Sequence, residues 1–370
     1  MIADESEIDG NEYSPSDTFS SNPLLADEEE YSYAETTAKP SPEAITPTRT
    51  TPLGYDANIS SWLTVCSQQM TKLFKSASTN SSGDFNSVIY ELDTLLQRLD
   101  KDERLIDVLE LEIATRIKQI RALDDDLGGL ILKSIMMMLY AIKVGGRLKL
   151  NRDELRSFIL AAMVHHIGMA QISGDIRHKK EKLSKDEVEE IRTAPVKSHD
   201  YIGANGVTDA AILLAASQAQ ERFDGSGPQG LSGLDIAYSA RIIGLLSMFE
   251  ALIHYRPYRN RLLPRDAIRE LVNHYKQGFD PRLLKVLIES ISLYPVGTFV
   301  QLNSGDIGQV IQVNPRLPLR PLIRMMFDSH GDAISPREIN LQKQPNLMVQ
   351  RCMYEEGLQE LKDSSAQGDR

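Results

Sequence analysis

Residues 161–172 read AAMVHHIGMAQI and decide the fold of this chain. The two adjacent histidines, His165 and His166, end an apolar run whose residues recur at helical spacing. Asn151 and Glu154 mark where that helix begins, because these two side chains form a capping box for the first backbone N–H groups. An apolar helix with paired imidazoles is typical of a metal centre or of the remains of one. Which of the two it is decides whether the chain is an enzyme.

Composition places the chain among ordinary globular proteins with a sizeable core. It has 370 residues, of which 41% are hydrophobic and 25% charged. The net charge is −11, and residues 1–50 hold ten more acidic than basic residues, so the remainder is nearly neutral. Without a broad basic surface, we expect no nucleic-acid polymer among its partners.

The lack of a signal peptide and the spacing of the two cysteines indicate a cytoplasmic protein. Cys66 and Cys352 are far apart, which excludes a disulfide framework and a cysteine-based zinc site and fits a reducing compartment. The N-terminus lacks the basic and apolar regions of a signal peptide. The most apolar stretch, GGLILKSIMMMLYAIKVGG, is interrupted by Lys133 and Lys143, so we expect no membrane span.

The sequence predicts a mainly α fold class, a helical bundle followed by a small antiparallel β barrel or meander. Amphipathic periodicity and capping signals define the helices, and β-rich runs separated by NSGD and SHGD turns define the second part. The predicted divisions are a disordered acidic tail (1–52), an N-terminal helical region (53–126), the main helical domain (127–295), a β-rich domain (296–349) and a polar C-terminal tail (350–370).

The cluster RPYRNR contains Arg256 and Arg259. Guanidinium groups suit phosphate oxygens, so these two side chains are candidates for phosphate or nucleotide binding. Cations at a helix end are also favoured by the helix dipole alone, and the sequence leaves both interpretations open.

The order and spacing of several stretches across residues 127–295 resemble the HD-GYP family, metal-dependent phosphodiesterases of the second messenger cyclic di-GMP. AAMVHHIGM resembles the helix that ends in His-Asp-x-Gly-Lys, and EKLSKDEVEEIRTAP resembles the helix that ends in Thr-His-Pro. ERFDGSGPQGL resembles the segment that includes Gly-Tyr-Pro, and ARIIGLLSMFEALIHYRPYR the helix after it. The β-rich end resembles a small barrel often appended to such domains.

Departures from the family pattern fall where the resemblance places the metal ligands. His165 keeps its residue type, whereas His166 replaces an aspartate and Met169 a lysine. The other degenerate motif positions are Lys133, Ala194, Ala219, Gln220 and Ser247. A metal cluster that activates water needs several anionic or imidazole ligands, which alanines cannot supply.

The sequence therefore favours a catalytically inactive HD-GYP-like regulatory or interaction module in bacterial signalling, with no catalytic residues and no cofactor. Its expected partners are signalling proteins, a cyclic dinucleotide bound without hydrolysis, and a second copy of the chain. The alternative is an active cyclic di-GMP phosphodiesterase with a remodelled site. That site would hold iron or manganese through His165, His166, Asp200, Glu221 and Asp224.

Overall fold

The computed structural model describes residues 57–254, 261–314, 317 and 319–353. The predicted acidic tail up to residue 52 and most of the predicted C-terminal tail lie outside the described residues.

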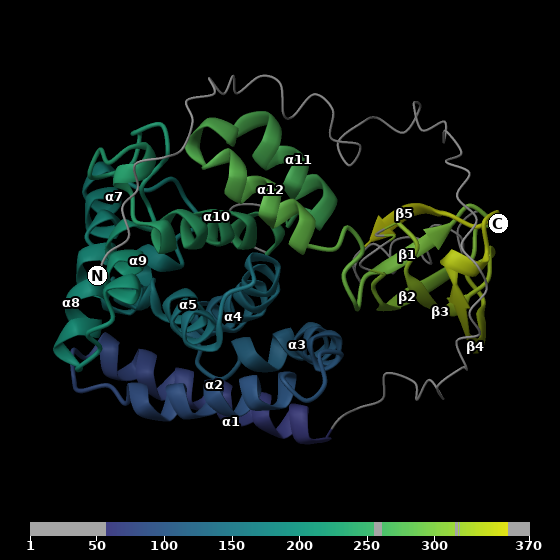
Figure 1. Cartoon of the computed structure of the whole chain (residues 1–370), viewed down its shortest axis with the longest axis horizontal. Helices are drawn as coiled ribbons and strands as arrows, with labels where there is room; N and C mark the ends of the chain where they lie inside the picture. The colour runs from purple at the N-terminus through teal and green to yellow at the C-terminus, as the bar shows by residue number, and fades with distance from the viewer. Residues whose placement is uncertain (1–56, 255–260, 315–316, 318, 354–370) are drawn as a thin grey trace. The chain divides into compact units, whose positions relative to one another are not determined.

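Helices make up the described chain as far as residue 290 (Figure 1). The α-helices are α1 (Ala57–Ser78), α2 (Phe85–Leu99), α3 (Leu105–Arg121), α4 (Gly128–Leu148), α5 (Arg152–Val164), α6 (Gly174–Arg177), α7 (Lys185–Arg192), α8 (Ala194–Ala204), α9 (Ala210–Gln218), α10 (Tyr238–Ile253), α11 (Pro264–His274) and α12 (Pro281–Ser290). Short 3-10 turns connect some of them, namely η3 (Ile167–Gln171), η4 (Gly233–Asp235) and η5 (Lys276–Gly278).

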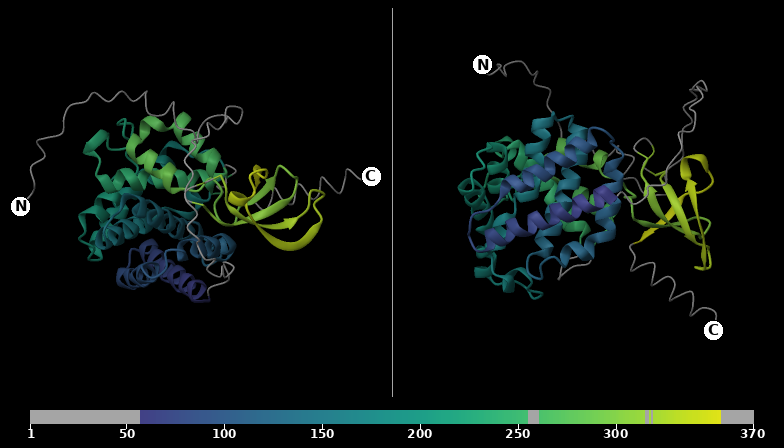
Figure 2. Two further views of the ribbon diagram at one scale, coloured as in Figure 1. Left: turned by 45° about the vertical axis from the view of Figure 1, so that its right-hand side comes forward. Right: turned by 90° about the horizontal axis from the view of Figure 1, so that it is seen from below.

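Helix α4 is the centre of this bundle. It is apolar on all sides and packs against α1, α3, α5, α10 and α12. Helices α1 and α2 lie on one side of α4 and α5, and α10 to α12 lie on the other (Figures 1 and 2). Among the described helices, α4 is long and apolar enough to cross a membrane, and 78% of its most apolar window is buried within the fold.

Capping signals set several helix starts as predicted. Asn151 and Glu154 form the capping box of α5, and Ser184 and Glu187 form that of α7. Helices α11 and α12 begin with a proline at the first helical turn, where its missing N–H costs nothing.

The helix before the histidine pair ends earlier than predicted. Helix α5 stops at Val164, His165 is its C-cap, and the 3-10 turn η3 follows His166. The two imidazoles are therefore not on one continuous helix, where neighbours point about 100° apart. Their ring centroids lie 4.6 Å from each other.

The β-rich part forms a five-stranded antiparallel sheet in the order β4-β3-β2-β1-β5. Its strands are β1 (Phe299–Leu302), β2 (Ile307–Gln312), β3 (Leu322–Phe327), β4 (Ala333–Asn340) and β5 (Val349–Met353). The first four strands form a meander, and β5 returns to pair with β1, so that Val300 lies opposite Cys352. Because β5 extends to residue 353, the β-rich domain continues past its predicted boundary at residue 349.

Candidate functional site

A cavity of about 180 Å³ lies within the helical bundle, lined by residues of α4, α8, α9 and α10 and by the turn after α5. All eight degenerate motif positions line it: Lys133, His165, His166, Met169, Ala194, Ala219, Gln220 and Ser247. Leu130, Pro195, Ser198 and Ala216 complete the lining. The structure thus brings together, in one place, positions that span more than a hundred residues of sequence.

Two backbone carbonyl groups set the tautomers of the two histidines. His165 Nδ1 lies 2.9 Å from the carbonyl oxygen of Ala162, and a carbonyl only accepts, so this nitrogen carries the proton. His166 Nε2 lies 3.1 Å from the carbonyl oxygen of Leu130 and donates for the same reason. His166 Nδ1 is then an acceptor, 3.4 Å from His165 Nδ1. The ring of Phe74 packs against His166 at 5.4 Å between centroids.

The His165 side chain is neutral across the physiological pH range. Burial, the larger effect, and the nearby ammonium of Lys133 together lower its pKa to about 3, against the hydrogen bond to Ala162. With Nδ1 protonated, Nε2 carries a lone pair. Nε2 is buried and has no hydrogen-bond partner among the described residues. His165 therefore offers a buried acceptor beside the cavity.

Lys133 brings a positive charge into the cavity wall. Its side chain is only 15% exposed. Its Nζ donates to Ser247 Oγ at 2.8 Å and lies 4.0 Å from Glu250 Oε2. The other oxygen of the Glu250 carboxylate lies 3.3 Å from His254 Nδ1. Glu250 does not line the cavity, so its negative charge lies behind the ammonium.

Close backbone packing fixes the cavity wall around Gly168. A Cβ at this position would lie 2.3 Å from the carbonyl oxygen of Ala194, so only glycine fits. The Gly168 N–H donates to Ser198 Oγ at 2.8 Å, which joins the turn after the histidines to α8. Sequence analysis gave no role to Ser198, since nothing local in the sequence indicates that it faces Gly168.

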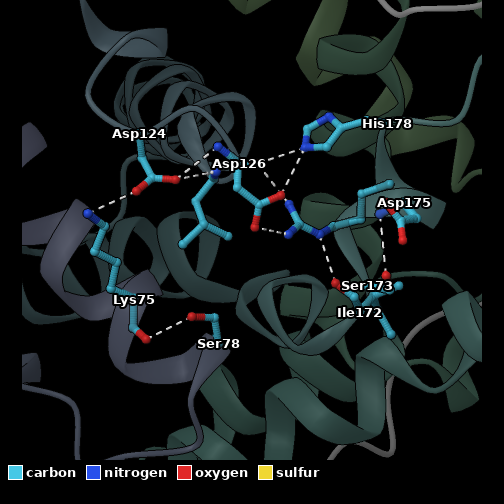
Figure 3. Close-up of polar contacts among 10 residues, drawn as sticks. Lys75, Ser78, Asp124, Asp126, Ile172, Ser173, Asp175 and His178 are labelled. Atoms are coloured by element: carbon cyan, nitrogen blue, oxygen red, sulfur yellow. Dashed lines mark hydrogen bonds and ion pairs between the residues drawn. The ribbon is translucent and has the colours of Figure 1, made fainter.

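The loop before α4 is tied to the segment that follows η3 (Figure 3). The Asp126 carboxylate accepts from His178 Nε2 at 3.1 Å and from the guanidinium of Arg177, whose side chain is 6% exposed. Asp124 pairs with Lys75 Nζ at 2.9 Å. These contacts hold the beginning of α4, the end of α1 and the segment after the histidines in one arrangement.

The lining residues do not fit a catalytic metal cluster. Ala194 and Ala219 present methyl groups, and Lys133 presents an ammonium that repels a cation. Within the part of the chain that the structure describes, no group of three or more His, Cys, Asp or Glu side chains is placed to hold a metal ion. His165 Nε2 is the clearest donor that remains, and a single imidazole does not hold a catalytic cluster.

The five alternative metal ligands are not brought together. His165 and His166 line the cavity, but Asp200 is exposed and pairs with its neighbour His199. The Glu221 carboxylate accepts the backbone N–H groups of Gln229 at 2.8 Å and Leu231 at 3.1 Å. The Asp224 carboxylate accepts from Ser226, both the backbone N–H and the hydroxyl. Local hydrogen bonds thus occupy the carboxylates of Glu221 and Asp224. The predicted phosphate contacts Arg256 and Arg259 lie outside the described residues.

Comparison with known proteins shows two family matches. A model of the HD domain matches residues 105–283, and a model of a KOW domain associated with HD domains matches residues 299–361. The first match begins at Leu105, the first residue of α3.

The relatives of the chain include proteins named cyclic di-GMP phosphodiesterases. The chain is 28% identical over 218 residues to phosphodiesterase PdeB of Borreliella burgdorferi, covering 58% of this chain and 57% of that protein. It is 30% identical over 196 residues to the phosphodiesterase response regulator RpfG of Xanthomonas campestris, covering 51% and 52%. The match thus spans about half the length of these relatives. An HDG"Y"P protein from Bdellovibrio bacteriovorus has a TM-score of 0.49 and 13% identity, covering 65% of this chain and 73% of that one.

Proposed function

We propose that the chain is a non-hydrolytic member of the HD-GYP family of HD domains, a cytoplasmic regulatory or interaction module in bacterial signalling. Its role would be to bind a ligand or a signalling protein through a fold that its enzymatic relatives use for catalysis.

One observation carries this proposal, the ammonium of Lys133 in the cavity wall. Its Nζ is 2.8 Å from Ser247 Oγ and has the Glu250 carboxylate behind it at 4.0 Å. A metal-dependent phosphodiesterase places cations where they neutralise the phosphate and lower the pKa of a bound water. An ammonium supplies charge but has no open coordination position for water, so it does not replace that chemistry.

A cyclic dinucleotide is the ligand that the relatives' names suggest. The cavity, at about 180 Å³, is smaller than the roughly 300–1,000 Å³ of pockets that enclose drug-sized ligands. A cyclic dinucleotide would therefore lie largely outside it. We propose Arg256 and Arg259 as its phosphate contacts. Replacing both with alanine should weaken metal-independent cyclic di-GMP binding at least tenfold, and unchanged affinity would remove them from the proposal.

The alternative is a metal-dependent cyclic di-GMP phosphodiesterase that uses iron or manganese. The activity named for the relatives and the unpartnered Nε2 of His165 favour it. It requires the carboxylates of Asp200, Glu221 and Asp224 to leave their present partners and turn towards the histidines.

A hydrolysis assay separates the two functions. The full chain would be incubated with cyclic di-GMP and Mn²⁺ or Fe²⁺ under anaerobic conditions, and linear products would be quantified. We expect no turnover above that of a His165→Ala variant. Turnover that is lost in His165→Ala but kept in His178→Ala, a matched change of an exposed histidine outside the cavity lining, would overturn the proposed function.

A further inference from the structure

We propose that the cavity is a metal-free site for a phosphate group that still carries a proton, either inorganic phosphate or a singly protonated phosphomonoester. The inference rests on the proposed function, because a metal cluster would need the same space. It differs from binding of a cyclic dinucleotide, whose phosphodiesters carry no proton at neutral pH.

Hydrogen-bond donors converge on one side of the cavity. Lys133 and Ser247 line it together, and the Lys133 ammonium carries three N–H donors, one of which is directed to the Ser247 hydroxyl. Helix α8 begins at the cavity, where Ala194 and Pro195 are part of the lining. The start of a helix carries a partial positive charge and favours an anion. These groups suit the oxygens of an oxyanion.

One of the lining side chains carries a buried acceptor. The His165 imidazole lines the cavity, and its buried Nε2 has a lone pair but no hydrogen-bond partner among the described residues. A buried acceptor without a partner is unfavourable, and a ligand O–H would remove that cost. Since Nε2 is enclosed, the ligand must sit directly against the ring, with a small shift of the imidazole. A fully deprotonated oxyanion has no O–H to donate, so a lone pair on its oxygen would face the lone pair of Nε2 and be repelled.

Charge and size limit the ligand further. Glu250 lies behind Lys133 and balances much of its charge, so the cavity suits a singly charged anion better than a multiply charged one. A volume of about 180 Å³ accommodates a phosphate group but not a whole nucleotide. A phosphomonoester has a second pKa of about 6, so part of it keeps a proton near neutral pH.

The test compares oxyanions of similar size with and without a proton. The full chain, treated with chelator, is titrated at pH 7 with inorganic phosphate, sulfate and dimethyl phosphate by calorimetry. In parallel, the ¹⁵N resonance of His165 Nε2 is followed by NMR. We expect saturable phosphate binding at least tenfold tighter than that of sulfate or dimethyl phosphate, with a shift of the Nε2 resonance that the other two anions do not cause.

A variant pair assigns the binding to the cavity. Lys133→Met should weaken phosphate binding at least tenfold, whereas Lys118→Met, which removes an exposed lysine of α3, should leave it unchanged. If Lys133→Met does not fold, the Nε2 shift in the unmodified chain still decides the inference.

Three outcomes would overturn it. Equal affinity for phosphate and sulfate would show that no proton is recognised, and the absence of saturable binding would show that only water enters the cavity. In both cases the proposed function stands, because the hydrolysis assay tests it separately. Phosphate binding that appears only after Mn²⁺ is added would overturn the inference and count against the proposed function as well.

Discussion

Helix α4 carries two buried lysines, ten residues apart, that are paired in different ways. Lys143 Nζ contacts Glu110 Oε1 of α3 at 2.6 Å, and both side chains are nearly buried. Lys133 Nζ contacts the hydroxyl of Ser247, while its carboxylate partner Glu250 is 4.0 Å away. The charge of Lys143 is neutralised in a close ion pair that joins α4 to α3. The charge of Lys133 lies at the cavity wall, farther from its carboxylate partner. Its electric field acts on His165 and on any ligand in the cavity.

Replacing Lys143 with methionine tests the close pair and should have the largest effect. The Glu110 carboxylate would remain buried without its cation, and its Oε2 already has no partner among the described residues. Breaking a buried pair from one side costs about 3–5 kcal/mol, and we expect a loss of about 3 kcal/mol in unfolding free energy by urea denaturation. Lys118→Met is the control. A loss below about 1 kcal/mol would mean that the pair does not join the helices.

The pH dependence of stability tests the surroundings of this ion pair, because the pKa of Asp107 responds to both Glu110 and Lys143. Burial, the largest effect, and the Glu110 carboxylate raise the pKa of Asp107 from 3.8 to about 6, while Lys143 opposes the rise. A raised pKa in the folded state means that stability is greatest below pH 4 and is lost as pH rises through 6. Relative to Asp107→Asn, the unmodified chain should lose about 2 kcal/mol between pH 4 and pH 7 in urea denaturation. Parallel stability curves for the two proteins would contradict this.

Replacing Lys133 with methionine tests the charge at the cavity wall, and its effect on stability should be smaller. Glu250 keeps His254 as a neighbour at 3.3 Å, and the hydrogen bond to Ser247 is lost. We expect a cost of about 1–2 kcal/mol in unfolding free energy. The pKa of His165 should rise, because the cation that helps to lower it is gone. An NMR titration of His165 that is identical in both proteins would contradict the role given to this ammonium.

The fold was largely accessible from the sequence because its signals are local. The capping boxes at Asn151 and Ser184 and the apolar run of α4 lie within single helices, and each formed as predicted. The end of α5 before His165 was not foreseen, since a switch to a 3-10 turn depends on packing around Gly168. Strand β5 was missed because its sequence, VQRCM, is short and half polar and is specified by pairing with β1.

The sequence indicated which residues line the cavity, but not which of their side chains contact one another. The eight motif positions come from the resemblance to the HD-GYP family, and they line one cavity. Contacts such as Phe74 with His166, or Lys133 with Ser247, join residues that are far apart in the chain. One sequence contains no signal that pairs them, and the tautomers of the two histidines depend on such contacts.

The central claim is that Lys133 supplies the charge for which an active relative needs metal ions. Elemental analysis of the full chain, purified anaerobically without chelator or histidine tag, tests it most directly. We predict no iron, manganese or other transition metal above the level found in a His165→Ala variant. Two or more equivalents of iron or manganese that are lost in that variant would contradict the claim and favour a working phosphodiesterase site.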